Sequence, residues 1–341
     1  MVLLLALLAA SAVAQQPAKN DDTPSIKVGA QIFADYTYGQ EPLLLDADGN
    51  RVHPSAFNVT RAYINVTGNL TRSIAYRVTP DISRESGAGT SLAGSQLFRL
   101  KYAYAQFNPA EWAPKGTWLR FGMQPTPFME YAEPIYRYRF QGQLFEDREG
   151  FESTADTGIA ARTTLPGGVD LQGGIFNGEG FSRAETNNEK SAQLRATWTP
   201  FRTGIASGLH LTGYVHDDHY FERAPRRRLI GQVAFTHPRF TAGFDYLATR
   251  DQKSTSLPEI EGRGFTAWVV PKLGGGWEVL LRHDQFRPDS RSSIVRRRDI
   301  EGLAYWFPLP KGLSTALMLD RDSTRDTART TNWGVKMMVA F

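Results

Sequence analysis

The chain has 341 residues, of which 41% are hydrophobic, and 39 Lys and Arg face 35 Asp and Glu, a net charge of +4. An excess this small argues against a nucleic-acid-binding protein, which would concentrate basic residues on one face. There is no cysteine, and this excludes disulfide scaffolds, zinc–thiolate sites and cysteine nucleophiles.

The N-terminal segment resembles an export signal. Residues 2–10 form an unbroken apolar run, and the Ala-Val-Ala of residues 12–14 is typical of a small-residue cleavage site. We therefore expect a cleaved signal peptide at 1–14, a periplasmic tail at 15–25 and one domain at 26–341. After the signal, no stretch approaches the ~18 apolar residues of a transmembrane helix. An exported chain of this kind is periplasmic, secreted or a transmembrane β-barrel.

The rest of the chain is a series of segments in which apolar and polar side chains alternate, as they do in β-strands with one apolar face. Each segment has about the 9–11 residues that cross a bilayer at a tilt. Sixteen such segments follow one another, at 26–38, 57–68, 71–82, 96–108, 116–124, 154–165, 168–177, 189–199, 207–217, 227–237, 239–249, 262–271, 276–287, 298–307, 312–322 and 330–341.

The alternation also predicts which way side chains point. In 96–108 the expected apolar face carries Phe98, Leu100, Tyr102 and Tyr104, opposite Arg99 and Lys101. In 330–341 the expected lipid face carries Trp333, Val335, Met337, Val339 and Phe341, whereas Lys336 points inward. Rows that end in aromatic residues suit the girdles at a membrane–water interface. A soluble sandwich with the same pattern would need a very large sheet, so we favour a membrane barrel.

The connections between these segments alternate in length. Short ones lie at 68–70, 166–167, 238, 271–275 and 308–312, and long ones at 39–56, 83–95, 125–153, 178–188, 218–226, 250–261, 288–297 and 321–329. Short periplasmic turns and long external loops are typical of outer-membrane barrels, and an even strand number puts both termini on the periplasmic side. The longest loop is the third. We expect it to fold inward and constrict the lumen; an external flap is the alternative.

Three short motifs and the final residue resemble a known family. They are Arg-Ala-Tyr-Ile-Asn-Val at 61–66, Arg-Phe-Gly-Met-Gln-Pro-Thr-Pro-Phe at 120–128, Gly-Ile-Phe-Asn-Gly at 174–178, and Phe341. Together they resemble the phosphate-selective porin O and P family. The resemblance implies a sixteen-stranded, usually trimeric channel, often conducting anions, whose terminal aromatic is read by the barrel-assembly machinery. The third loop lacks the lysine cluster of the best-known phosphate-selective members, which leaves the solute open.

The candidate site is the set of basic side chains that the alternation directs into the lumen or the third loop carries. These are Arg61, Arg77, Arg99, Lys101, Arg120, Arg137, Arg139, Arg162, Arg195 and Arg282. Acidic residues expected in the lumen are Asp170, Asp245, Glu278, Asp284 and Asp320. Opposed walls of charge filter ions, and Arg binds phosphate and carboxylate bidentately. The alternative is that each Arg pairs with a neighbouring carboxylate and only solvates the lumen.

Other motifs carry less chemistry. His216-Asp217-Asp218-His219 resembles a metal-ligand cluster but lacks a third positioned ligand, and catalytic signatures such as G-x-S-x-G are missing from the sequence. The arginines at 226–228 and 296–298 lie at loop edges, where they suit lipopolysaccharide phosphates.

The sequence therefore predicts an all-β outer-membrane porin, a passive diffusion channel for small hydrophilic solutes with a weak to moderate preference for anions, phosphate among them. We expect no catalytic site, cofactor, metal or nucleic acid. Expected partners are outer-membrane lipid and lipopolysaccharide, the barrel-assembly machinery through Phe341, and two further copies in a homotrimer. The alternatives are a barrel-embedded hydrolase and a non-conducting structural or adhesion barrel.

Overall fold

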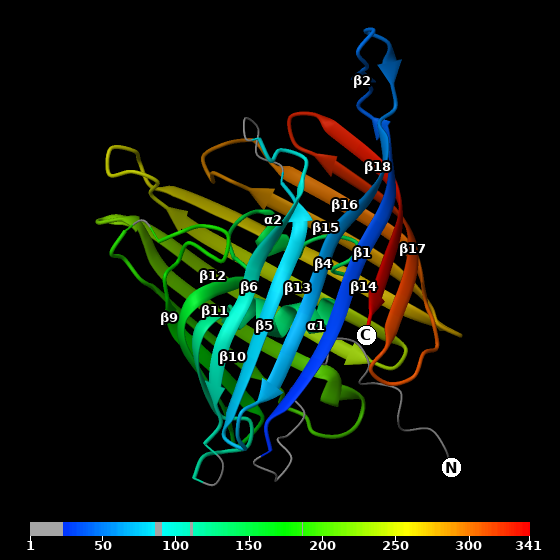
Figure 1. Cartoon of the computed structure of the whole chain (residues 1–341). Helices are drawn as coiled ribbons and strands as arrows, with labels where there is room; N and C mark the ends of the chain where they lie inside the picture. The colour runs from blue at the N-terminus through cyan, green and yellow to red at the C-terminus, as the bar shows by residue number, and fades with distance from the viewer. Residues whose placement is uncertain (1–22, 86–90, 110–111, 186) are drawn as a thin grey trace.

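The computed structural model describes residues 23–85, 91–109, 112–185 and 187–341, and in them sixteen antiparallel strands close into one barrel (Figure 1). The expected signal peptide lies outside the described residues. No helix in the described ranges is long and apolar enough to cross a membrane.

The strands of the barrel follow one another around the wall in chain order. They are β1 (Ser25–Glu41), β4 (Ser55–Asn69), β5 (Ile74–Arg84), β6 (Gln96–Phe107), β7 (Trp118–Pro125), β8 (Ala155–Leu165), β9 (Val169–Phe176), β10 (Ser191–Trp198), β11 (Leu209–Phe221), β12 (Ala224–His237), β13 (Phe240–Asp251), β14 (Ile260–Gly274), β15 (Trp277–Arg287), β16 (Arg296–Trp306), β17 (Ser314–Arg325) and β18 (Arg329–Ala340). A small hairpin, β2 (Leu44–Leu45) and β3 (Arg51–Val52), projects beyond one rim (Figure 1). The helical elements are α1 (Pro127–Tyr136), α2 (Phe145–Arg148) and η1 (Ile205–Gly208).

The first and last strands close the barrel. β1 pairs with β18 from Gln31 opposite Ala340 onward. Beyond that register, the Ala30 N–H donates to the Phe341 carbonyl at 2.9 Å, and the Phe341 N–H donates to the Ala30 carbonyl at 3.0 Å. Closure leaves no unpaired sheet edge, and lipid permits no other arrangement of strands. The predicted sixteen-stranded barrel is confirmed.

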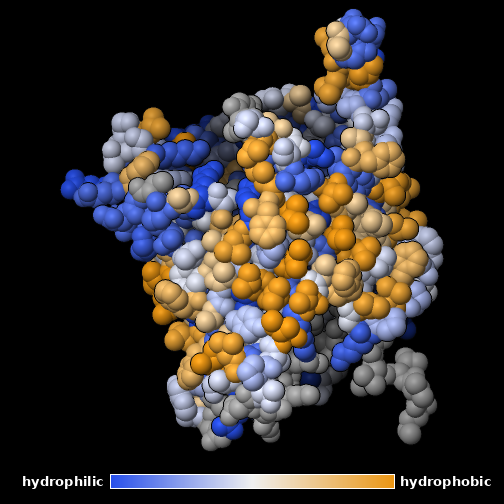
Figure 2. All heavy atoms as spheres, in the orientation of Figure 1, coloured by the Kyte–Doolittle hydropathy of each residue, from blue (hydrophilic) through white to orange (hydrophobic). Residues whose placement is uncertain are grey.

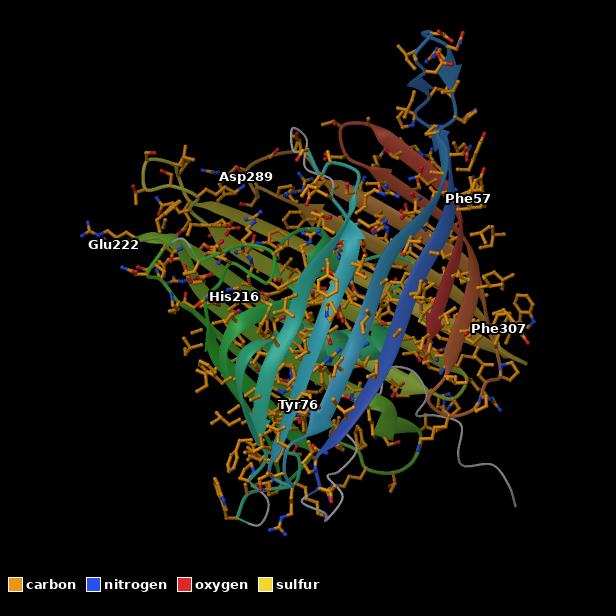
Figure 3. The ribbon with its side chains drawn as sticks, in the orientation of Figure 1. Phe57, Tyr76, His216, Glu222, Asp289 and Phe307 are labelled. Atoms are coloured by element: carbon orange, nitrogen blue, oxygen red, sulfur yellow. The ribbon has the colours of Figure 1, made fainter. Side chains whose placement is uncertain are left out.

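Apolar side chains cover the outer wall, as alternation predicts. Phe121 is 72% exposed on the outside whereas its neighbour Arg120 is 3% exposed on the inside. An apolar band lies between more polar ends on the face shown in Figure 2. Phe57 and Phe307, marked in Figure 3, are among the outer aromatic residues. This surface is suited to lipid rather than to water.

The expected direction of Tyr102 and Tyr104 is wrong. In the pairing of β5 with β6, Thr79 lies opposite Tyr102 but Pro80 lies opposite Leu100, so Lys101 is an extra residue. Pro80 has no N–H to donate to a ladder, and prolines in sheets therefore favour bulges. The bulge turns Lys101 and Tyr102 inward together, and Tyr104 follows.

Two of the expected long loops are much shorter. β11 runs to Phe221 and β12 starts at Ala224, so the predicted loop 218–226 reduces to a two-residue connection with Glu222 at its tip (Figure 3). Likewise the predicted loop 321–329 shortens to residues 326–328, because β17 runs to Arg325 and β18 begins at Arg329. The extended ends of these strands carry polar residues on both faces, so their alternation fades and the sequence resembles a loop. We call this rim of the barrel the loop end and the opposite rim the turn end.

Candidate functional site in the barrel lumen

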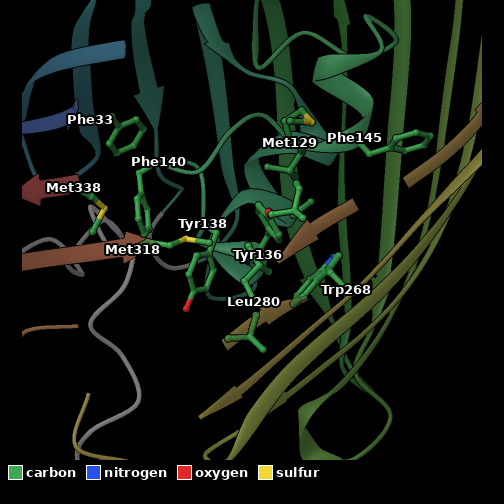
Figure 4. Packing of buried hydrophobic residues seen from close by; sticks show 14 of the residues in the cluster. Phe33, Met129, Tyr136, Tyr138, Phe140, Phe145, Trp268, Leu280, Met318 and Met338 are labelled. Carbon is green, nitrogen blue, oxygen red and sulfur yellow. The ribbon is translucent and has the colours of Figure 1, made fainter. Parts of the chain in front are cut away.

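The third loop, residues 126–154, folds into the lumen as predicted, and the external-flap alternative is wrong. Its helices α1 and α2 bring Phe128, Met129 and Phe145 inside, each at most 1% exposed. Figure 4 shows two further loop residues, Phe140 and Tyr136, beside Phe33 and Trp268 of the wall. The loop therefore fills much of the space that a barrel of this size would leave as water.

The third loop packs on a set of apolar residues on the otherwise polar inner face of the barrel, which we call the docking surface. Phe140 of the loop lies 6.4 Å, centroid to centroid, from Phe33 of β1, and Tyr136 lies 5.3 Å from Trp268 of β14. The wider cluster contains Tyr63, Tyr214, Leu247, Leu280, Ile300, Met318 and Met338. Burying such side chains against each other stabilises the loop by about 1.5–3 kcal/mol per large side chain.

Several of the predicted basic residues hold the start of this loop. Arg120 of β7 donates through Nη1 to both carboxylate oxygens of Glu130, at 2.8 and 2.9 Å, and stacks on Trp118. Arg195 of β10 donates through Nε to the Pro127 carbonyl at 3.1 Å and forms an ion pair with Asp170. Arg120 and Arg195 each share their charge with a carboxylate and are almost fully buried, so these contacts fix α1 rather than attract ions.

β15 holds the middle of the loop. Arg282 donates through Nη1 to the Tyr136 hydroxyl and to the Gln143 carbonyl, each at 3.1 Å. Glu278 accepts from the Tyr138 hydroxyl at 2.7 Å and forms an ion pair with Arg137. Removing one partner of such a buried pair leaves an uncompensated charge, which is strongly destabilising.

A charged cluster of the loop faces β4 and β6. Arg139 bridges Glu133, at 3.1 Å, and Asp147, at 3.2 Å. Burial raises the pKa of Asp147, although Arg139 opposes the shift. Across from this cluster, the Lys101 ammonium lies 4.9 Å from the ring centroid of Tyr63. The charges of the loop cluster are thus paired within the loop, whereas Lys101 contacts an aromatic ring.

The strands β5 and β6 carry basic side chains without a carboxylate partner. Arg77 donates to the Asn65 and Thr79 side chains, and Arg99 donates to Ser83 at 2.9 Å. Lys101 donates to the Tyr63 hydroxyl at 3.5 Å. Within the described ranges none of the three forms an ion pair. We call Arg77, Arg99 and Lys101 the basic wall.

The remaining predicted residues are paired. Arg61 of β4 lies 2.5 Å from the fully buried carboxylate of Asp81, and Arg162 of β8 lies 2.8 Å from Asp170. Arg61 also lines a cavity of about 540 Å³ between the loop and strands β1, β4 and β16–β18, together with Arg139, Arg148, Arg296 and Arg298. Four carboxylates also line this space, Asp35, Glu149, Asp322 and Asp326, and the last three pair with these arginines.

Sequence reasoning missed several inward carboxylates that pair with the arginines, such as Asp81 and Asp322, which binds Arg298. It also missed a relay at the loop end. Ser191 Oγ lies 2.9 Å from His216 Nε2, and His216 Nδ1 lies 2.7 Å from Glu152. The alternating pattern could have indicated that the strand residues among them point inward.

The Ser191–His216–Glu152 chain has the connectivity of a serine-hydrolase relay. Ser191 is 0% exposed, however, and Gln193 donates to its hydroxyl at 3.1 Å, so a substrate has no access to the nucleophile. The relay instead ties the end of the third loop to β10 and β11. Within the described ranges no group of three or more potential ligands could hold a metal.

A buried acid in α2 predicts pH dependence of loop docking. Burial raises the pKa of Glu146 well above its usual value of 4.5, and the neighbouring Asp245 carboxylate adds to the shift. As the pH rises above this usual value, Glu146 loses its proton in the unfolded chain but keeps it in the folded protein. The free energy of unfolding therefore falls until the pH reaches the folded-state pKa. The loss is about 1.4 kcal/mol per pKa unit. We expect the unfolding temperature of the wild type to fall across this window and that of Glu146→Gln to fall less steeply.

The measurement is thermal unfolding in detergent at a series of pH values. Glu222→Gln removes an acid that is 82% exposed and should keep the wild-type slope. An identical slope for Glu146→Gln and the wild type would show that Glu146 does not couple docking to pH.

Comparison with known proteins agrees with this architecture. The family model for phosphate-selective porin O and P matches residues 26–229. The chain belongs to this family. It is a porin, and the prediction of an outer-membrane channel is confirmed. No curated protein sequence matches the chain.

Solved porin structures share the fold at low sequence identity. The anion-selective porin from Comamonas acidovorans is 12% identical, with a TM-score of 0.64 over 94% of this chain and 100% of that chain. A trimer form of OmpT, an outer membrane protein of Vibrio cholerae, is 10% identical, with a TM-score of 0.59 over 94% and 100%. OmpF of Salmonella typhi, in complex with daunomycin, is 9% identical, with a TM-score of 0.63 over 93% and 97%.

Proposed function

We propose that this porin is a passive diffusion channel for small hydrophilic solutes that prefers anions weakly to moderately, with inorganic phosphate among the candidates. The observation that carries the proposal is the basic wall, Arg77, Arg99 and Lys101, which faces the lumen and, among the described residues, has only neutral hydrogen-bond partners. Most other predicted basic residues already share their charge with a carboxylate.

The physical reason is electrostatic. A wall of uncompensated cations beside a narrow passage raises the local concentration of anions and repels cations. Arginine stays protonated at any physiological pH, so the preference should persist across that range. The compensated arginines contribute little, because each forms part of a neutral pair.

Reversal potentials in a potassium chloride gradient across a planar bilayer test the proposal. The variant Arg77→Gln/Arg99→Gln/Lys101→Gln should reduce the anion-to-cation permeability ratio at least about twofold. The control triple, Arg223→Gln/Arg227→Gln/Arg250→Gln, removes the same charge from exposed positions outside the lumen and should leave the ratio unchanged. Cation preference in the wild type, or an unchanged ratio in the lumen variant, would contradict the proposal.

The same proposal covers targeting and assembly. A signal peptide at 1–14 would be cleaved on export, leaving 15–25 as a periplasmic tail before the barrel at 26–341, and N-terminal sequencing of the mature protein tests this. The protein would lie in the outer membrane with the loop end outside, in contact with lipid and lipopolysaccharide. It would assemble as a homotrimer, which the trimeric OmpT supports by its similar fold, after recognition of Phe341 by the barrel-assembly machinery.

We propose no enzymatic role. Large, voltage-tolerant conductance steps would separate a channel from a barrel hydrolase or an adhesion barrel. Hydrolysis of phospholipid or peptide by the purified protein, lost in Ser191→Ala, would instead assign the buried relay a catalytic function.

A further inference from the structure

A row of arginines crosses five neighbouring strands, β14 to β18, at the loop end. Arg263 lies directly opposite Arg287, and Arg297 lies opposite Arg325, which in turn lies opposite Arg329. Arg287 and Arg297 are diagonal neighbours, because Arg297 pairs with Gln285, two residues before Arg287. We call these five residues the arginine row.

The row lies on the outside of the barrel. Arg287 shares its face of β15 with Leu281 and Trp277, which are both 45% exposed on the outer wall. Arg297 shares its face of β16 with Leu303, whereas Arg298 points inward to Asp322. Successive side chains of a strand point to opposite faces, so the row and the basic lining of the lumen are separate features.

Charge within the row is poorly compensated. The outermost members contact carboxylates on their exposed sides, Arg263 to Glu261 at 3.7 Å and Arg329 to Glu41 at 3.3 Å. Of the three central members, Arg297 donates only to the neutral Gln285, at 3.1 Å. Arg287 and Arg325 form no ion pair or side-chain hydrogen bond within the described ranges.

Neighbouring acids do not neutralise the row. Asp299 and Glu301 lie below Arg297 on the same face, but Asp299 binds His283 at 2.6 Å and Glu301 binds Arg321 at 3.5 Å. On β12 and β13, by contrast, the outer arginines have carboxylate partners, Arg227 with Asp217 and Arg250 with Glu259. Like charges directly opposite each other across strands are destabilising, so an anion bound on the outer side would stabilise the row.

We propose that the arginine row binds the phosphate groups of lipopolysaccharide in the outer leaflet. The row faces the membrane rather than the lumen, so a lipid-borne anion reaches it directly. Neighbouring strands are about 4.8 Å apart, so adjacent guanidinium groups can bind the same phosphate through paired hydrogen bonds. The inference rests on the proposed outer-membrane location with the loop end outside, and it adds the residues and the headgroup chemistry.

The test measures binding of purified lipopolysaccharide to the delipidated full-length protein in detergent. Arg287→Gln/Arg297→Gln/Arg325→Gln should weaken binding at least about tenfold. The control triple, Arg223→Gln/Arg227→Gln/Arg250→Gln, removes the same charge from arginines that already have carboxylate partners and should change it less than about twofold. Enzymatically dephosphorylated lipopolysaccharide should bind the wild type as weakly as the row variant binds the intact lipid.

Three results would overturn the proposal. Equal binding of intact lipopolysaccharide to wild type and row variant would remove the row from the site. Full competition by millimolar inorganic phosphate would indicate a general anion site. A row variant that changes oligomer size while binding lipopolysaccharide normally would make the row a contact between copies of the chain. The reversal potential in phosphatidylcholine bilayers should not change in the row variant. A failure of the lipopolysaccharide proposal can therefore be distinguished from a failure of the proposed anion preference.

Discussion

Excising the third loop should raise single-channel conductance severalfold. The change replaces residues 128–152 by a short Gly–Ser linker. It removes the helices and aromatic side chains that fill the lumen, and barrels of sixteen strands otherwise leave an aqueous channel. The two ends of the loop already meet, because the Thr126 hydroxyl donates to the Ser153 carbonyl at 2.6 Å. A short linker therefore bridges them without straining the wall.

Conductance in planar bilayers measures the result. Replacing 43–53, the projecting β2–β3 hairpin, by the same linker is the matched control, because this segment lies outside the lumen. The control should conduct like the wild type. Wild-type conductance in the excised variant, once resistance to heat in detergent shows that it has folded, would mean that the third loop does not limit flow.

Alternation alone was sufficient to predict most of the fold, because each lipid-facing strand must show apolar residues at every second position. It failed where a local event changes that period. At Lys101 the bulge opposite Pro80 shifts the pattern by one residue. At 218–221, polar residues on both faces remove the pattern although the strand continues.

The charges of the site were predictable only in part. Alternation indicates that Arg120, Arg195 and Arg282 point inward, but it does not indicate what they meet there. Their partners, such as Glu130 and the Pro127 carbonyl, come from a loop whose path depends on packing against many strands at once. One signal was available in the sequence. Apolar residues at inward positions, such as Trp268 and Leu280, mark the docking surface of the loop.

Deleting Phe341 should lower the amount of folded protein in the outer membrane by about tenfold or more. Two effects combine. The deletion removes the pair of backbone hydrogen bonds with Ala30 that extends the closing seam, and an open seam is costly in lipid. It also removes an exposed aromatic side chain, 62% accessible, which we propose is read by the assembly machinery. Quantitative immunoblots of isolated outer membranes measure the loss.

Substitution separates these two effects, because Phe341→Ala keeps the backbone hydrogen bonds and removes only the ring. If recognition dominates, Phe341→Ala should be as poorly assembled in cells as the deletion, and Phe341→Tyr should restore assembly. Both variants should still refold in detergent like the wild type, since no assembly machinery acts there. Normal outer-membrane levels of Phe341→Ala would instead assign the loss to the missing seam bonds, and Phe341 would then act through closure of the barrel with Ala30.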